Sequence, residues 1–174
     1  MTLEELSRAV AQCQRCPLRM TATQPVPDLI VPDCEYFLLG EAPGRDEDKA
    51  GTPFVGAAGK RLNVLVALTG IDLNKCSVGN VVRCRPPSVD RKQREPRKAE
   101  IRACIVWLRR ALAIAQPKTI ITLGRIPLSL FSRYGIKQMH GTQFEFDLDV
   151  EFICLRTKKK GGKDEDTKAN PDNL

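Results

Sequence analysis

The stretch EYFLLGEAPG, residues 35–44, decides the fold. The segment 35–39 is short and mostly apolar, which predicts a buried strand that ends at Gly40. A long loop rich in glycine, proline and acids then runs to Gly59, and a helix is predicted over 60–68 with Gly70 as its stop. In open α/β sheets ligands bind at the carboxyl ends of strands, and this loop leaves from such an end.

Strands and helices alternate along the rest of the chain. Thr2 and Glu5 form a capping box for a first helix that runs up to Cys13. Further strands are predicted over 76–82, 118–123 and, as one or two strands, 143–155; further helices are predicted over 97–115 and 124–134. This alternation predicts an α/β fold with an open parallel sheet covered on both faces.

Composition bounds the class of protein. With 174 residues, 42% of them hydrophobic, the chain suits one domain, expected over 1–155. Residues 156–174 have almost no large apolar side chains and predict a disordered tail. No apolar run approaches ~20 residues and the first residues do not resemble a signal peptide, so we expect no membrane span and a cytoplasmic location. Nothing in the sequence demands a dimer, and we expect a monomer.

The charge of the chain favours nucleic acid as its partner. The formal net charge is +7, which suits a polyanion. Ten Lys and Arg fall between residues 83 and 110, against three acids, and such a basic stripe is what phosphate binding uses. The alternative is a merely soluble basic protein.

The loop after the first strand carries residues suited to a planar ligand. Its glycines, Gly40 among them, let the backbone approach a ligand closely. Phe54 lies between a proline and a valine and is suited to stacking on a flat ring, although it could equally fill the core. Asn80, near the end of the 76–82 strand, offers an amide that can pair with a pyrimidine's O4 and N3–H, or satisfy local backbone instead.

Four of the seven cysteines predict one metal site. Cys13 and Cys16 form a C-x-x-C turn, while Cys84 and Cys104 come from far along the chain. Four thiolates make a soft ligand set that suits an iron–sulfur cluster or zinc, and the spacing does not separate the two. The other three cysteines are expected to be small buried apolar residues: Cys34, Cys76 and Cys154.

Taken in order, five segments resemble the family 4 uracil-DNA glycosylases, which are of the iron–sulfur type. They are the early C-x-x-C, GEAPG (40–44) followed by GTPFVGAAG (51–59), GNVVRCRPP (79–87), the cysteine on the next helix, and PKTIITLG (117–124). The resemblance implies a three-layer α/β/α fold with a central four-stranded parallel sheet. It also implies a DNA repair enzyme that flips uracil out of DNA and hydrolyses its N-glycosidic bond.

The resemblance assigns roles by position. Cys13, Cys16, Cys84 and Cys104 would bind a [4Fe–4S] cluster. Gly40, Phe54 and Asn80 would bind uracil, and Glu41 and Glu47 would serve catalysis. The basic loop would contact DNA containing uracil, single- or double-stranded, through Arg85, Arg91, Lys92, Arg94 and Arg97.

Two departures bear on catalysis. The best-known uracil glycosylases have an aspartate in this loop to position water, whereas this chain, like family 4, has Ala42. Family 4 members continue after the last strand into a His-Pro motif, but here Leu155 is followed by Arg-Thr-Lys, and the only histidine is His140. Loss of such a donor predicts a rate lower by ~10²–10³-fold. A non-catalytic DNA-binding protein of the same fold and a small redox carrier are the alternative readings.

Overall fold

The computed structural model describes residues 1–90 and 92–143. Its helices and strands in chain order are α1 (Leu3–Ala11), the 3₁₀ helix η1 (Pro17–Met20), β1 (Tyr36–Gly40), α2 (Arg45–Ala50), α3 (Ala57–Thr69), the 3₁₀ helix η2 (Leu73–Lys75), β2 (Cys76–Asn80), β3 (Ser88–Val89), β4 (Lys92–Gln93), α4 (Lys98–Ala115), β5 (Thr119–Thr122), α5 (Arg125–Phe131) and α6 (Ile136–Met139). The region expected to form the last strand and the tail lies outside these residues, apart from residue 143.

The described part of the central sheet has three parallel strands in the order β2-β1-β5. The register pairs Gly40 at the end of β1 with Asn80 at the end of β2. Because the strands are parallel, their carboxyl ends meet at one edge of the sheet, where the loops that follow β1 and β2 lie side by side. The fourth strand expected from the sequence falls among residues that the structure does not describe.

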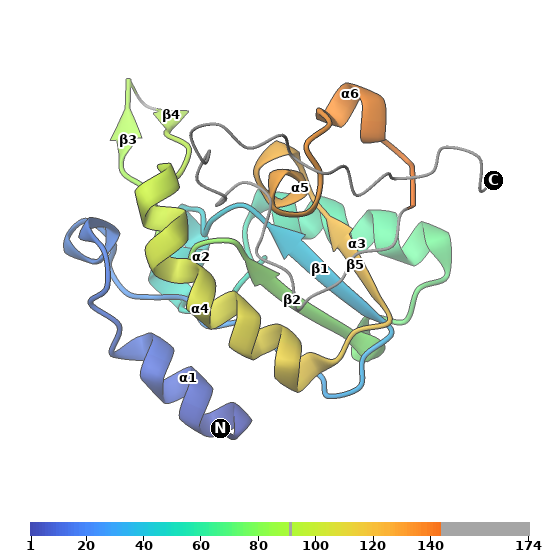
Figure 1. Ribbon diagram of the computed structural model, residues 1–174, viewed down its shortest axis with the longest axis horizontal. Coiled ribbons are helices and arrows are strands. Elements are labelled where there is room, and N and C mark those ends of the chain that lie inside the picture. Colours follow the sequence, from blue (N-terminus) through green and yellow to red (C-terminus); the bar gives the residue numbers. More distant parts are fainter. Residues whose placement is uncertain (91, 144–174) are drawn as a thin grey trace, which may run out of the picture.

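Helices cover both faces of this sheet (Figure 1). Side chains alternate along a strand, so Phe37 and Leu39 of β1 join the larger buried cluster with residues of α1, α4 and α5. Leu38 points the other way and packs with Leu62 and Val66 of α3. This arrangement confirms the predicted three-layer α/β/α architecture.

The sequence located most of the regular elements and missed the short helices α2 and α6. β1, β2, β5 and α4 lie within two residues of their predicted bounds. The prediction of an unbroken loop over 40–59 was wrong, because α2 occupies Arg45–Ala50 within it. Its sequence, RDEDKA, has no apolar periodicity, and what favours the helix is acidic side chains in the first turn.

A small antiparallel hairpin, β3–β4, rises beside α4 between Cys84 and Cys104 (Figure 1). Its base is tied down, since Arg85 donates to Gln93 and to Ser88. Gln93 in turn donates through Nε2 to the carbonyl of Pro43 at 3.0 Å, which fastens the hairpin to the loop after β1. No pattern in the sequence predicts this hairpin.

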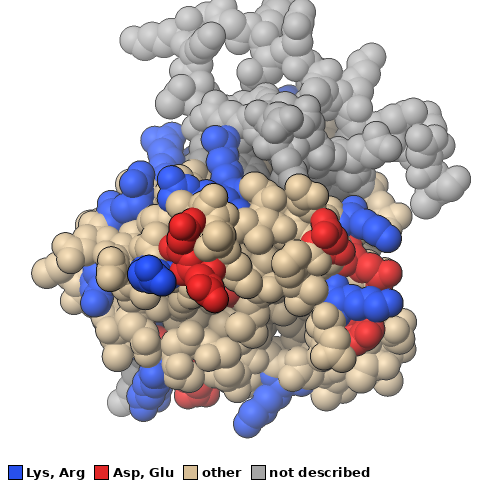
Figure 2. Space-filling model, turned by 90° about the horizontal axis from the view of Figure 1, so that it is seen from below, with Lys and Arg blue, Asp and Glu red and all other residues tan. Residues whose placement is uncertain are grey.

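Charges are spread unevenly over the surface. On the face shown in Figure 2, basic side chains gather at the upper left, others lie at the right and lower margins, and acidic side chains lie between and beside them. The middle of this face carries acidic and uncharged side chains. Among the described residues, none of the helices is both long and apolar enough to span a bilayer.

Candidate active site and cysteine cavity

Gly40, Phe54 and Asn80 come together at the carboxyl edge of the sheet. A Cβ atom placed on Gly40 would lie 2.6 Å from Asn80 Oδ1 and 2.6 Å from Phe54 Cζ. Only glycine lets the side chains of Asn80 and Phe54 come this close to the main chain here. The structure therefore gathers into one place the three residues that the sequence predicted to bind a planar base.

Phe54 is held in this place by an unusual backbone. Its φ is 57°, in the left-handed region that residues other than glycine seldom adopt. The chain passes so close to α3 that a Cβ on Gly59 would lie 1.6 Å from the carbonyl oxygen of Phe54. The ring is half-buried and packs against the cluster of Leu38 and Leu62. Phe54 thus serves the core with part of its surface and leaves the rest accessible.

Glu47 is a buried carboxylate that braces the loop. Its side chain lies on α2 and accepts a hydrogen bond from the backbone N–H of Gly56 at 2.7 Å. The neighbouring Asp48, also buried, accepts hydrogen bonds from the N–H and the hydroxyl of Thr23. The two acids thereby fix α2 to the loop at Gly56 on one side and to Thr23 on the other. The sequence did not single out Asp48.

Glu41, the first residue after β1, is half-buried at the same edge of the sheet. Burial raises the pKa of its carboxyl, and the negative charge of Glu95 adds to that rise, while Arg125 opposes it. Arg125 and Glu95 form an exposed ion pair with each other. Glu41 is therefore a carboxylate whose proton affinity is tuned upward by its surroundings.

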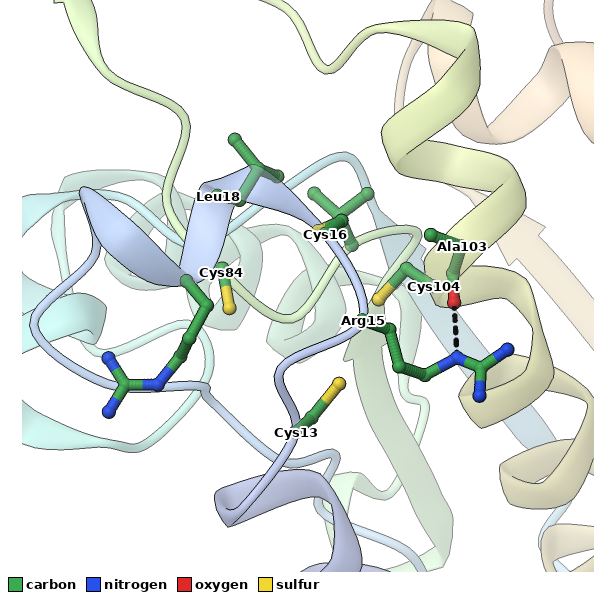
Figure 3. Close-up of a pocket in the computed structure, with 9 residues that line it drawn as sticks. Cys13, Arg15, Cys16, Leu18, Cys84, Ala103 and Cys104 are labelled. Atoms are coloured by element: carbon green, nitrogen blue, oxygen red, sulfur yellow. Dashed lines mark hydrogen bonds between the residues drawn. The ribbon is translucent and has the colours of Figure 1, made fainter.

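The four predicted cysteine ligands line one cavity (Figure 3). Cys13 and Cys16 come from the turn between α1 and η1, Cys84 from the segment after β2, and Cys104 from α4. Two of the sulfurs accept hydrogen bonds: the indole N–H of Trp107 donates to Cys13 at 3.1 Å, and the backbone N–H of Arg83 donates to Cys104 at 3.3 Å. Such N–H donors stabilise thiolate ligands.

Burial raises the pKa of three of the cavity thiols, those of Cys84, Cys16 and Cys104. Burial raises the pKa of Cys84 to about 12, and the neighbouring cysteines add to the rise. Burial likewise raises the pKa of Cys16 and Cys104. All six described cysteines are free. Cys34 and Cys76 are buried away from the cavity, as predicted, and Cys154 lies outside the described residues.

The donors of the cavity are four thiols, a soft ligand set that suits an iron–sulfur cluster or zinc. Within the described ranges, no three His, Cys, Asp or Glu side chains are grouped as the ligands of one metal ion. A zinc ion would need all four sulfurs within about 2.3 Å of one point. A [4Fe–4S] cluster takes each sulfur on a different iron and so accepts thiols spread around a cavity.

The predicted DNA-binding cations differ in whether their side chains are exposed or already bound to other residues. Lys92 and Arg97 are exposed. Arg85 is engaged with Gln93 and Ser88, as described above, and Arg94 makes a two-pronged ion pair with Glu100 at 2.6 and 2.8 Å. Arg91 lies outside the described residues. Arg83, which the sequence placed in the basic stripe, is buried and cannot contact phosphate.

Protonation of Glu100 in acid is expected to lower the free energy of unfolding. Burial alone would raise its pKa, but hydrogen bonds from Arg94 and the Arg97 N–H outweigh burial and lower the pKa in the folded state. The stabilisation is therefore complete above the unfolded pKa of about 4.3 and is lost as pH falls through the lower folded value.

We expect Glu100→Gln to reduce the free energy of unfolding at pH 7 by about 1.5–3 kcal/mol. Urea unfolding at several pH values should show the difference between wild type and variant narrowing below pH ~4. A difference that stays constant down to pH ~2 would contradict the role given to Glu100.

Comparison with known proteins places this geometry in a family. Residues 27–163 match the family model of the uracil DNA glycosylase superfamily. A type-4 uracil-DNA glycosylase of Sulfurisphaera tokodaii is 41% identical over 136 residues, which cover 77% of this chain and 60% of the relative. That of Archaeoglobus fulgidus is 36% identical, covering 91% of this chain and 71% of the relative.

A third relative, the type-4 uracil-DNA glycosylase of Pyrobaculum aerophilum, is 34% identical over 92% of this chain and 78% of its own length. The chain thus spans between 60% and 78% of the length of these relatives. Both the superfamily match and the relatives agree with the geometry of the sheet edge described above. The chain belongs to the uracil-DNA glycosylase superfamily and, within it, to the type-4 enzymes.

Proposed function

We propose that this protein is a DNA repair glycosylase that flips uracil out of DNA and excises it by hydrolysis of the N-glycosidic bond. The observation that carries the proposal is the convergence of Gly40, Phe54 and Asn80 on one space at the carboxyl edge of the sheet. An aromatic face, an amide and a bare backbone are what a flat pyrimidine with one hydrogen-bonding edge requires.

Each residue of the pocket has a part in the reaction. Phe54 stacks on the extruded base, and the Asn80 amide pairs with its O4 and N3–H. Burial raises the pKa of Glu41, and a raised carboxyl pKa favours a part in proton transfer. We assign to Glu41 the stabilisation of positive charge on the sugar or the orientation of water. Glu47, whose carboxylate binds the Gly56 N–H, supports catalysis by holding the loop.

The cysteine cavity is proposed to hold a [4Fe–4S] cluster through Cys13, Cys16, Cys84 and Cys104. The cluster would supply a structural tie and no chemistry at the glycosidic bond. Cys84 and Cys104 stand on either side of the β3–β4 hairpin, so fixing them fixes the exposed cations Lys92 and Arg97 for contact with phosphate. The substrate is DNA containing uracil, and the protein acts on it as a monomer in the cytoplasm.

The test is excision of uracil by this chain from single- and double-stranded oligonucleotides, read out by alkaline cleavage of the resulting abasic sites. We expect wild type to release uracil and Gly40→Ala to be slower by at least ~10-fold, because the added methyl group would collide with Asn80 and Phe54 and displace them. Gly135→Ala is the matched control, since a Cβ there meets nothing within 4 Å. Binding of DNA with uracil left intact would instead identify a non-catalytic DNA-binding protein.

A further inference from the structure

Arg83 is buried between the base pocket and the cysteine cavity. The residue is only 1% exposed and is among the largest fully buried side chains of the described structure. Arginine is seldom buried, because removing its charge from water is costly unless the charge is paired. Its location therefore requires an explanation other than the phosphate binding expected for the basic stripe.

The contacts of Arg83 reach both sites. Its guanidinium donates from Nη1 to the carbonyl of Asn80 at 2.8 Å and makes a longer contact, 3.4 Å, with the carbonyl of Val81. Nη2 pairs with the carboxylate of Asp28. Its own backbone N–H donates to the sulfur of Cys104. One residue thus joins the main chain of the base pocket to the wall of the cysteine cavity.

The main chain at Asn80 depends on these contacts, because β2 ends there. On one side, the N–H groups of Val81 and Val82 donate to the carbonyls of Gly40 and Glu41. On the other side of β2, an isolated bridge pairs Leu29 with Val78, and this pairing stops two residues before Asn80. The buried carbonyl of Asn80 therefore needs a donor, and the Arg83 guanidinium supplies it.

The ion pair with Asp28 is poorly suited to stabilising the fold by itself. Asp28 Oδ1 and Arg83 Nε have no hydrogen-bond partner in the part of the chain that the structure describes. Asp28 also lies so close to β2 that a Cβ on Gly79 would be 2.1 Å from Oδ1. A buried pair with unsatisfied atoms is often no more stable than apolar residues of similar volume. The pair instead holds the guanidinium within hydrogen-bonding distance of the Asn80 carbonyl.

We infer that Arg83 is a positioning residue for the base pocket: it holds the main chain of Asn80 so that the amide faces the space beside Gly40 and Phe54. The inference rests on the proposed function, because it assigns Asn80 to the base. A displacement of about 1 Å in such a group can cost ~10²-fold in rate. Arg83 itself does not touch the substrate.

The test replaces the buried pair by uncharged residues of similar size, Asp28→Asn with Arg83→Met. We expect kcat/KM for uracil release to fall by ~10- to 10²-fold, mainly through kcat, while binding of uracil-free DNA is unchanged. Introduced into Asn80→Ala protein, the same two substitutions should change kcat/KM by less than ~3-fold, because Arg83 acts through Asn80. A merely structural role would give the full loss in both backgrounds.

Arg83→Lys is the second variant, and it decides the matter if the double substitution does not fold. Lysine keeps a charge beside Asp28, but its single ammonium lacks the fork that reaches Asp28 and the Asn80 carbonyl together. We expect the same direction of loss, again absent in Asn80→Ala protein. Wild-type rates in both variants, or losses that multiply with Asn80→Ala, would overturn the inference while leaving the proposed function intact. A wild type that leaves uracil in DNA would overturn both.

Discussion

Replacing Asn80 with alanine is expected to lower kcat/KM for uracil release by ~10²–10³-fold. The Asn80 side chain is 5% exposed and lies against Gly40 at the end of β2. Its Oδ1 lies beside Gly40 and Phe54, 2.6 Å from where a Cβ on Gly40 would be. Alanine removes the donor and the acceptor of the amide and leaves the uracil edge unpaired in a buried site.

The matched control for this change is Ser77→Ala on the same strand. The Ser77 hydroxyl exchanges hydrogen bonds with the backbone of Val31 and lies at the other end of β2. We expect Ser77→Ala to lower the free energy of unfolding by about 1–3 kcal/mol and to leave kcat/KM unchanged. Single-turnover excision and urea unfolding measure the two effects separately. If Asn80→Ala is as active as wild type, the Asn80 amide does not bind the base.

Much of this site could be predicted because its parts are local in sequence. The buried strand at 36–40, the long helix of α4 and the C-x-x-C turn each have a pattern of their own. The clustering of Gly40 with Asn80 follows from parallel pairing, since both residues end neighbouring strands. Periodicity and strand order were therefore sufficient to bring these residues together.

The parts that could not be predicted are long-range polar contacts. Arg83 and Asp28 are 55 residues apart, and neither lies in a pattern that distinguishes it from a surface charge. Glu47 stays a predicted catalytic residue, and its carboxylate also accepts a hydrogen bond from a backbone N–H nine residues away, which no local pattern indicates. Burial of a charge is decided by what packs over it, and hydrophobic periodicity carries no information on that.

Replacing Cys16 with alanine is expected to remove the cluster and to lower the midpoint of thermal unfolding by about 5–15 °C. The cavity brings together three separate segments, namely the turn after α1, the chain after β2 and α4. A cluster that joins them would stabilise the fold much as a disulfide does, by about 2–5 kcal/mol, because binding free energy becomes folding free energy. Iron and sulfide content, visible absorption and thermal unfolding are the measurements.

Among the four predicted ligands Cys16, like Cys13, is only half-buried, so alanine there removes little packing. The effect should therefore vanish when both proteins are stripped of iron: apo wild type and apo Cys16→Ala should unfold within about 0.5 kcal/mol of each other. Cys76→Ser is the control, since the Cys76 thiol lies outside the cavity and donates to the carbonyl of Asp72, a bond that a hydroxyl can also make. Full iron content in Cys16→Ala, or an equal loss of iron in Cys76→Ser, would show that the cavity is not the cluster site. If the iron is lost but stability is kept, the cluster does not tie the three segments together, and the exposed cations Lys92 and Arg97 must be ordered by the hydrogen bonds of the protein, such as those of Gln93 and Arg85.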